Sequence, residues 1–238
     1  ATVIASCRFV AQPLEPFARS IHVVYNGVAR PATPAPAPRS APRVGVIARI
    51  APEKGQADFV AAARRVAPLV PGCRFLICGA PLFGNPEAER YAASLSREPG
   101  SPVELLDWRA DVSSVLAGLD LLVAPSSAVE ATTRTILEAY AAGVPVVAYD
   151  AGGISEILID NETGFLVRPA TPEALGERIA GLLTGPRERL DRVAERARAA
   201  WRDHFTIDRY QRRIVEVICA AQTAPGSAGA KACPEPLG

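Results

Sequence analysis

Short apolar runs alternate with longer segments of helical periodicity along most of the chain. The apolar runs are short enough for buried strands, and they lie at residues 43–48, 73–78, 103–106, 121–124, 145–149 and 164–167. The intervening segments carry apolar side chains at helical spacing, and they lie at residues 56–67, 86–97, 112–117, 132–142, 154–159 and 172–183. Strands that alternate with helices form βαβ units, so the pattern predicts an α/β fold with a doubly wound, Rossmann-like parallel sheet.

We expect this domain to occupy residues 43–221, with its last part, from residue 186 onward, formed by Arg-rich helices whose charged face is solvated. The first 30 residues contain two further strand candidates, at residues 2–6 and 21–27. We expect no partner domain for either of these strands. Residues 1–30 are therefore predicted to be a remnant of another domain.

Two further segments have compositions that oppose core formation. Residues 31–42 are rich in Pro and Ala, which predicts a semi-rigid linker. Residues 222–238 contain Gly, Pro, Ser and Ala without periodicity, which predicts a disordered tail. Residues 160–164 have the composition of a turn, for which we expect a structural role.

Composition narrows the classes of function. The chain has 238 residues, 49% of them hydrophobic, and a net charge of +1, so a sizeable core is expected and nucleic acid is disfavoured as a partner. No apolar run is long enough to predict a membrane span, and no signal peptide is visible. The five cysteines form no C-x-x-C pair, and Cys73 and Cys78 lie in or beside an apolar strand, which favours reduced thiols in a cytoplasmic protein. The chain contains no methionine, so we expect it to be a piece of a longer protein.

The stretch from residue 121 to residue 148 carries the most chemistry. It reads as a strand, a polar loop, a helix, a Gly-Val-Pro turn and a second strand. Glu130 lies just before the predicted helix and Glu138 lies inside it, about 12 Å away if the whole interval is helical at 1.5 Å per residue. A helix N-terminus attracts phosphates and polarised hydroxyls, so the loop before this helix is a candidate ligand site.

Two cations follow the first strand of the predicted domain. Arg49 and Lys54 flank a turn that leads into the next helix, at the carboxyl edge of the sheet. A guanidinium and an ammonium at that edge suit a diphosphate. The alternative is a solvated ion pair of Arg49 or Lys54 with the neighbouring Glu53.

Other residues are expected at the same edge of the sheet. Gly79 follows the second strand, Trp108 and Arg109 follow the third, and a Gly-Gly pair with Glu156 follows the fifth. Each has a plainer interpretation: turn chemistry for the glycines, packing at the domain edge for Trp108, and a favourable helix-dipole contact for Glu156. Asp111 is predicted to cap the helix that begins at residue 112.

Several of these motifs together resemble a known family. Glu130 and Glu138, separated by seven residues and followed by Ala-Tyr-Ala-Ala-Gly-Val-Pro-Val-Val-Ala, resemble the E-x7-E signature of retaining GT-B nucleotide-sugar glycosyltransferases, the glycosyl transferases group 1. The resemblance covers most of residues 44–183 and includes the Gly-Arg-x4-Lys-Gly motif, in which Ala48 replaces the usual glycine.

This resemblance implies a role for each site residue. Arg49 and Lys54 would hold and stabilise the departing diphosphate, without a metal ion. Glu130 and the backbone amides of Ala131, Thr132 and Thr133 would face the sugar, and Glu138 would hold the ribose hydroxyls. Gly79, Trp108 and Arg109 would line the rest of the donor site, near the nucleotide base.

The implied function is the C-terminal, donor-binding half of a GT-B enzyme. The acceptor, a glycan or a lipid, would be bound through an N-terminal domain absent from the chain, and peripheral contact with the cytoplasmic face of a membrane is an open alternative. Two rival functions remain: a sugar-nucleotide epimerase of the same architecture and a non-catalytic nucleotide-binding module. A Rossmann dehydrogenase is disfavoured, because no G-x-G-x-x-G follows the first strand. The base, the sugar and the acceptor are not determined by the sequence.

Overall fold

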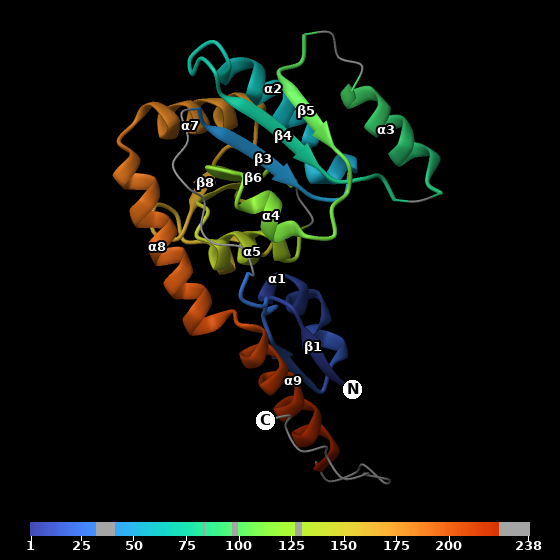
Figure 1. The fold of residues 1–238 in the computed structure, drawn as a ribbon. Helices are drawn as coiled ribbons and strands as arrows, with labels where there is room; N and C mark the ends of the chain where they lie inside the picture. The colour runs from blue at the N-terminus through green and yellow to red at the C-terminus, as the bar shows by residue number, and fades with distance from the viewer. Residues whose placement is uncertain (32–40, 83, 97–99, 127–129, 224–238) are drawn as a thin grey trace.

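Six parallel strands form the central sheet of the chain (Figure 1). The structure is a computed structural model that describes residues 1–31, 41–82, 84–96, 100–126 and 130–223. The strands are β3 (Arg43–Ile47), β4 (Arg74–Cys78), β5 (Val103–Leu106), β6 (Leu121–Ala124), β7 (Val146–Tyr149) and β8 (Phe165–Val167). Each lies within two residues of a predicted run at both ends, so the predicted α/β fold class is confirmed.

The strand order places the candidate site. The strand order in the sheet is β5-β4-β3-β6-β7-β8. Strands β3 to β5 are added toward one edge of the sheet and strands β6 to β8 toward the other, so the topological switch point lies between β3 and β6. In doubly wound sheets, ligands bind outside the carboxyl ends of the strands at such a switch point. The loops that follow β3 and β6 lie at this position. They carry Arg49, Lys54 and Glu130, and the helix that follows the second loop carries Glu138.

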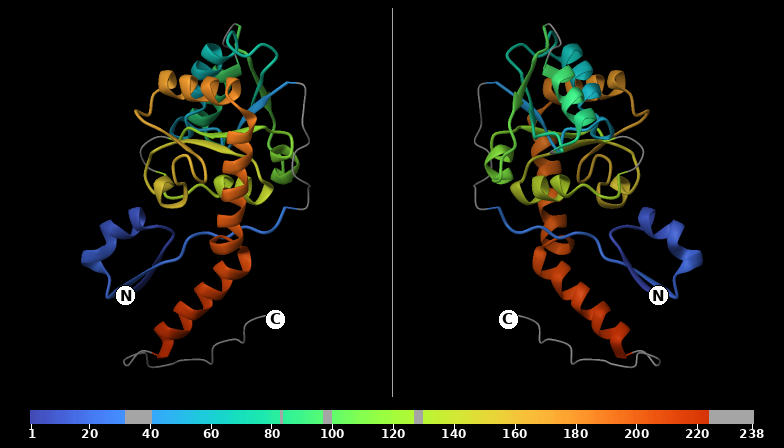
Figure 2. Two further views of the ribbon diagram at one scale, coloured as in Figure 1. Left: turned by 90° about the vertical axis from the view of Figure 1, so that its left-hand side faces the viewer. Right: turned by 90° about the vertical axis from the view of Figure 1, so that its right-hand side faces the viewer.

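Helices cover both faces of the sheet (Figures 1 and 2). One buried cluster joins side chains of β3 and β4 to those of α2 and α7, and another joins β6 and β7 to α4, α5 and α6. Leu190 and Val193 of α8 belong to the first cluster, whereas Ala197 and Trp201 belong to the second, so α8 bridges the two layers. The helices are α2 (Gln56–Val66), α3 (Pro86–Ser96), α4 (Val112–Leu116), α5 (Arg134–Ala142), α6 (Ile154–Ile157), α7 (Pro172–Thr184) and α8 (Arg187–His204).

Two helix predictions need correction. The helix predicted at residues 132–142 begins at Arg134, so Glu130 lies in the loop four residues before it. The helical stretch predicted from residue 186 onward is two helices with a break between them. The first, α8, ends at His204, and the second, α9 (Ile207–Thr223), begins three residues later. At this break, Val28 donates to the carbonyl oxygen of Phe205 at 2.9 Å and accepts from the amide of Ile207 at 3.1 Å. The local sequence does not reveal this pairing, because Val28 lies far away in the chain.

Both strand candidates of the N-terminal segment overlap strands of the structure. The segment forms β1 (Thr2–Ala5), α1 (Arg8–Ala11), a 3-10 helix at Gln12–Phe17 and β2 (Ser20–Val23). The two strands pair with each other in parallel and form a separate two-stranded sheet. Figure 2 shows this segment beside α9, on the side of the domain where α8 ends.

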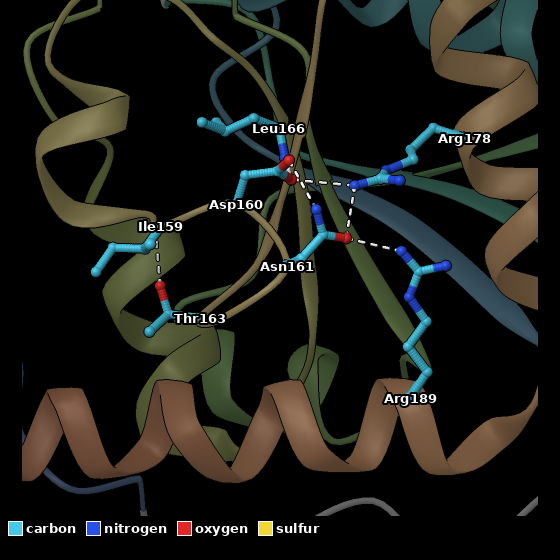
Figure 3. Close-up of polar contacts among 7 residues, drawn as sticks. All are labelled: Ile159, Asp160, Asn161, Thr163, Leu166, Arg178 and Arg189. Atoms are coloured by element: carbon cyan, nitrogen blue, oxygen red, sulfur yellow. Dashed lines mark hydrogen bonds and ion pairs between the residues drawn. The ribbon is translucent and has the colours of Figure 1, made fainter.

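The turn at residues 160–164 has the structural role that was predicted (Figure 3). Asn161 has a positive φ of 60°, and its side-chain oxygen accepts from Arg178 of α7 and Arg189 of α8. The Asp160 carboxylate accepts from the amide of Leu166 at 2.9 Å, and the Thr163 hydroxyl accepts from the amide of Ile159 at 2.9 Å. These contacts fix the start of β8 against two helices.

The remaining predictions concern the termini and the cysteines. Most of the predicted linker, residues 32–40, and most of the predicted tail, residues 224–238, lie outside the described residues, while residues 222 and 223 belong to α9. Cys73 and Cys78 are free thiols as predicted, whereas Cys219 takes part in a disulfide bond. None of the helices in the described ranges combines the length and the apolar character that crossing a membrane requires.

Candidate functional site

The loops after β3 and β6 bring a lysine and a glutamate into contact at the switch point. Lys54 ends a short 3-10 helix (Pro52–Lys54), and its ammonium donates to the Oε2 atom of Glu130. Their side chains are only 20% and 13% exposed, so the ion pair is largely shielded from water. Two of the three residues predicted to be catalytic therefore lie together, although 76 positions separate them in the chain.

Arg49 lies at the start of the same loop but has a different partner. Its guanidinium donates to Glu53 at 2.6 Å, and both side chains are about half exposed, at 44% and 52%. The pKa of Glu53 is lowered, first by a backbone hydrogen bond and then by this arginine. Arg49 thus forms the solvated pair that we considered as the alternative, while its side chain also lines the pocket described next.

A pocket of about 180 Å³ opens beside this loop. Among its lining residues are Arg49, Gly79, Trp108 and Arg109, which come from the ends of β3, β4 and β5. A Cβ atom at Gly79 would lie 1.9 Å from the carbonyl oxygen of Ala48, so only glycine allows these two loops to approach so closely. Trp108 is 66% exposed, which leaves much of its ring available to a ligand. We call this hollow the central pocket.

A second pocket adjoins the central pocket at Val112 and contains Glu138. Its volume is about 240 Å³, and its walls come from α4, α5 and the segment at residues 28–31. Burial raises the pKa of Glu138, and Arg134, whose guanidinium lies 3.9 Å away, opposes this shift only in part. Glu138 is therefore a desolvated carboxylate with a weak partner. We call this hollow the Glu138 pocket.

The loop that begins at Glu130 ends in an extended residue, Thr133, directly before α5. Thr133 is the N-cap of α5, with φ −83° and ψ 123°. The backbone amides of Ala131, Thr132 and Thr133 donate to no acceptor within the described part of the chain, so they are available to an anionic or hydroxylic ligand. The Thr132 hydroxyl is occupied, because it accepts from the side-chain amide of Asn26 at 3.3 Å.

Sequence reasoning missed the partners of Glu156. Its carboxylate accepts from the backbone amides of Arg8 and Phe9 and from the Tyr25 hydroxyl, each at 2.8 Å. The Gly-Gly pair before it allows close backbone approach, and the amide of Gly153 donates to the carbonyl oxygen of Glu130 at 2.9 Å. The partners of Glu156 lie more than 130 positions away, so no local signal could have identified them.

A larger cavity of about 480 Å³ lies elsewhere, between the end of β2, α6 and α9. None of the residues predicted to be catalytic or donor-binding lines it, although Glu156 does, and much of its wall is apolar, with Val23, Ile157 and Phe205 among the lining residues. The topology and the convergence of charged groups favour the switch point over this larger hollow as the reactive site.

Comparisons with known proteins identify a family and several relatives of the chain. Residues 34–200 match the family described as glycosyl transferases group 1. Trehalose synthase of Pyrococcus horikoshii is 28% identical over 183 residues, which are 74% of this chain and 43% of that protein. D-inositol 3-phosphate glycosyltransferase of Segniliparus rotundus is 34% identical over 167 residues, which are 68% and 36% of the two proteins. The chain thus spans less than half of the length of these two curated relatives.

A solved structure extends the comparison to the fold. The crystal structure of Anabaena Alr3699/HepE in complex with UDP-glucose aligns with a TM-score of 0.77 at 26% sequence identity, covering 92% of this chain and 64% of that one. The fold and this likeness define a Rossmann-like α/β domain of the GT-B type, and the candidate site lies at its topological switch point. The family match covers well over half of the chain. The chain belongs to the glycosyl transferases group 1.

Proposed function

We propose that this chain is the C-terminal, donor-binding half of a retaining glycosyltransferase that moves a sugar from a nucleotide diphosphate sugar to an acceptor. The observation that carries the proposal is the contact between Lys54 and Glu130 at the switch point, next to two adjoining pockets that contain Arg49 and Glu138. A nucleotide diphosphate sugar needs this set of groups: cations for the diphosphate, a carboxylate for the ribose, and a carboxylate near the sugar.

Arg49 and Lys54 would hold the diphosphate and stabilise its charge as it departs. Both cations now contact carboxylates, so a bound diphosphate would replace or share Glu53 and Glu130 as their partners. The exposed pair of Arg49 costs little to open, about 0–1 kcal/mol. Because two cations meet the phosphate charge, we propose that binding requires no metal ion.

The two glutamates would act at opposite ends of the donor. Glu138, in its own pocket, would accept hydrogen bonds from the ribose hydroxyls, which would compensate its desolvated charge. Glu130 and the free amides of Ala131, Thr132 and Thr133 would face the sugar. In this arrangement the ribose contact strengthens binding, while the contacts to the sugar can increase as charge develops in the transition state.

The relatives support this assignment by what they act on. Anabaena Alr3699/HepE was crystallised with UDP-glucose, and the relative from Segniliparus rotundus is a D-inositol 3-phosphate glycosyltransferase. We propose a nucleotide-sugar donor for this chain on that basis, and an acceptor glycan or lipid bound by a further domain. A cytoplasmic location is part of the same proposal, and peripheral membrane contact stays an alternative.

Calorimetry tests the proposal directly. UDP, GDP and ADP are titrated into the chain with and without EDTA, and at least one is expected to bind with an affinity that EDTA leaves unchanged. If none of the three binds, the donor-binding function is wrong. Binding that EDTA abolishes would instead overturn the metal-free part of the proposal.

A further inference from the structure

Glu156 binds the N-terminal segment of the chain at two separate places. One place is the start of α1, where the amides of Arg8 and Phe9 donate to its two carboxylate oxygens. The other is the end of the segment that follows β2, where the Tyr25 hydroxyl donates to Oε2. A single carboxylate therefore accepts three hydrogen bonds from two stretches that otherwise lie on either side of β2.

The same two stretches contact the loop that carries Glu130. The Cys7 thiol donates to the carbonyl oxygen of Ala131 at 3.4 Å, and the side-chain amide of Asn26 donates to the Thr132 hydroxyl at 3.3 Å. Cys7 and Asn26 are each the immediate sequence neighbour of a residue that donates to Glu156. If Arg8 or Tyr25 moved relative to the Glu156 carboxylate, the neighbouring Cys7 or Asn26 would therefore move relative to the loop.

The turn before α6 also supports the loop, next to the contact that Cys7 makes. A Cβ atom at Gly152 would lie 1.9 Å from the carbonyl oxygen of Glu130, and one at Gly153 would lie 2.0 Å from that of Ala131 and 2.8 Å from the Cys7 sulfur. The loop is thus in contact with both this turn and the N-terminal segment, which meet each other at Cys7 and Gly153. Glu156, three residues after Gly153, joins the two supports to each other.

From this geometry we infer that Glu156 is a positioning residue for the sugar end of the donor site. It fixes the N-terminal segment against α6, and this fixes Glu130 and the free amides of the loop where the sugar binds. The inference rests on the proposed function, because it assigns that end of the site to the sugar. Tyr25 remains a donor over the ordinary pH range, since burial and the contact with Glu156 raise its pKa to about 12.

The test compares two ligands that share everything except the sugar. Two titrations are made: one with the nucleoside diphosphate that binds the chain (UDP, GDP or ADP), and one with the glucose ester of that nucleotide. Replacing Glu156 with glutamine places an NH₂ group where an oxygen accepts from an N–H, so at least one contact is lost. Glu156→Gln should weaken binding of the glucose ester about fivefold more than binding of the nucleotide alone, as expected for the loss of about one hydrogen bond at the sugar end.

Glu162→Gln is the matched control. Glu162 is an exposed glutamate six residues further on, so the same chemical change there should leave the ratio of the two affinities unchanged. If Glu156→Gln lowers the melting temperature but leaves that ratio as in the wild type, Glu156 is only a structural anchor and the inference is wrong.

Two milder variants keep the inference testable if Glu156→Gln does not fold. Tyr25→Phe removes one of the three hydrogen bonds, and Asn26→Ala removes the contact with Thr132. Both should change the affinity ratio in the same direction as Glu156→Gln. Unchanged ratios in both would overturn the inference.

Hydrogen exchange separates this inference from the proposed function. The amide of Gly153 donates to the carbonyl oxygen of Glu130, so its exchange rate reports whether the loop stays in place. Glu156→Gln should accelerate that exchange about tenfold, whether or not a nucleotide binds. If the wild type binds no nucleotide but the exchange is accelerated, the proposed function fails while the positioning role of Glu156 stands. An unchanged exchange rate would contradict the positioning role.

Discussion

The two ends of the candidate site hold their charges in opposite ways. At the proposed diphosphate end, Lys54 already has a carboxylate partner, Glu130, in a largely shielded position. At the proposed nucleoside end, Glu138 is half-buried, partial burial raises its pKa, and its nearest cation, Arg134, lies 3.9 Å away. One end carries a satisfied ion pair and the other carries a carboxylate that burial destabilises.

Because of this difference, ligand contacts at the two ends are expected to contribute differently to the free energy of binding. A ligand at the diphosphate end has to exchange partners with groups that are already paired, so part of its interaction energy is cancelled. A ligand that donates to Glu138 supplies hydrogen bonds that the free protein lacks, so it gains affinity without displacing a strong partner. Each mutation below breaks one side of this comparison.

The largest effect is expected from Lys54→Ala. It removes a cation from the diphosphate and leaves Glu130 without its partner, so nucleoside diphosphate affinity should fall by about 3 kcal/mol, the upper part of the range for hydrogen bonds to charged groups. Arg49→Ala should cost about 1.5–3 kcal/mol of affinity. Calorimetry measures both variants. Arg65→Ala, which breaks an exposed ion pair with Glu173 on the helix face, is the control and should not change affinity.

The second largest effect is expected from Glu138→Gln, which should change nucleotide affinity and thermal stability in different ways. Glu138→Gln should weaken nucleoside diphosphate binding by about 1–2 kcal/mol, since an amide is a poorer acceptor than a carboxylate. The melting temperature at neutral pH should not fall, because the charge that burial disfavours is gone. Glu177→Gln, an exposed change on α7, serves as the control for both measurements. A lower melting temperature with intact nucleotide affinity would show that Glu138 serves the fold instead.

The raised pKa of Glu138 also gives a pH dependence with a definite sign. Since its folded-state pKa lies above its unfolded value, its charge reduces stability as pH rises through the interval between the two values. Protonation at low pH removes the acceptor for the ribose, so nucleotide affinity should fall as pH decreases, beginning above the usual range for glutamate. In Glu138→Gln this component of both pH profiles should be absent.

A smaller effect is expected from Glu130→Gln. The affinity for free nucleoside diphosphate should stay the same or rise slightly, because Lys54 no longer has a competing carboxylate. Stability should fall by about 1–3 kcal/mol, since a shielded lysine loses its partner. In a protein that also contains the acceptor domain, kcat should fall while nucleotide affinity is kept. A marked loss of free-nucleotide affinity would contradict the assignment of Glu130 to the sugar.

The smallest effect is expected from Trp108→Ala. The ring is mostly exposed at the mouth of the central pocket, so its removal should cost nucleotide affinity only about 0.5–1.5 kcal/mol and change stability little. A fluorescence titration of the wild type, with Trp201 buried as the internal reference, should show a change on nucleotide binding that the variant lacks. If the variant gives the same change, Trp108 does not contact the nucleotide.

The sequence allowed the central domain to be predicted because its signals are local. Apolar runs and breaker residues lie where the strands and turns are, and Asp111 caps α4 as predicted, with its carboxylate accepting from Ser114 at 3.2 Å. Parallel topology then places the loops after the strands at one edge, which brought the predicted site residues together without any knowledge of distances.

What the sequence could not show depends on contacts between distant segments. The pairing of Val28 with the break between α8 and α9, and the three hydrogen bonds of Glu156 to the N-terminal segment, have no local signature. The late start of α5 also reflects its surroundings: Asn26 holds Thr132 in the loop that the helical periodicity had included in the helix.

A crystal structure of the chain with the nucleoside diphosphate that binds best tests the central claim most directly. The account predicts ribose hydroxyls within hydrogen-bond distance of Glu138, and the Lys54 ammonium on the terminal phosphate instead of solely on Glu130. A nucleotide bound in the cavity between β2, α6 and α9, or one bound while Lys54 contacts only Glu130, would contradict it.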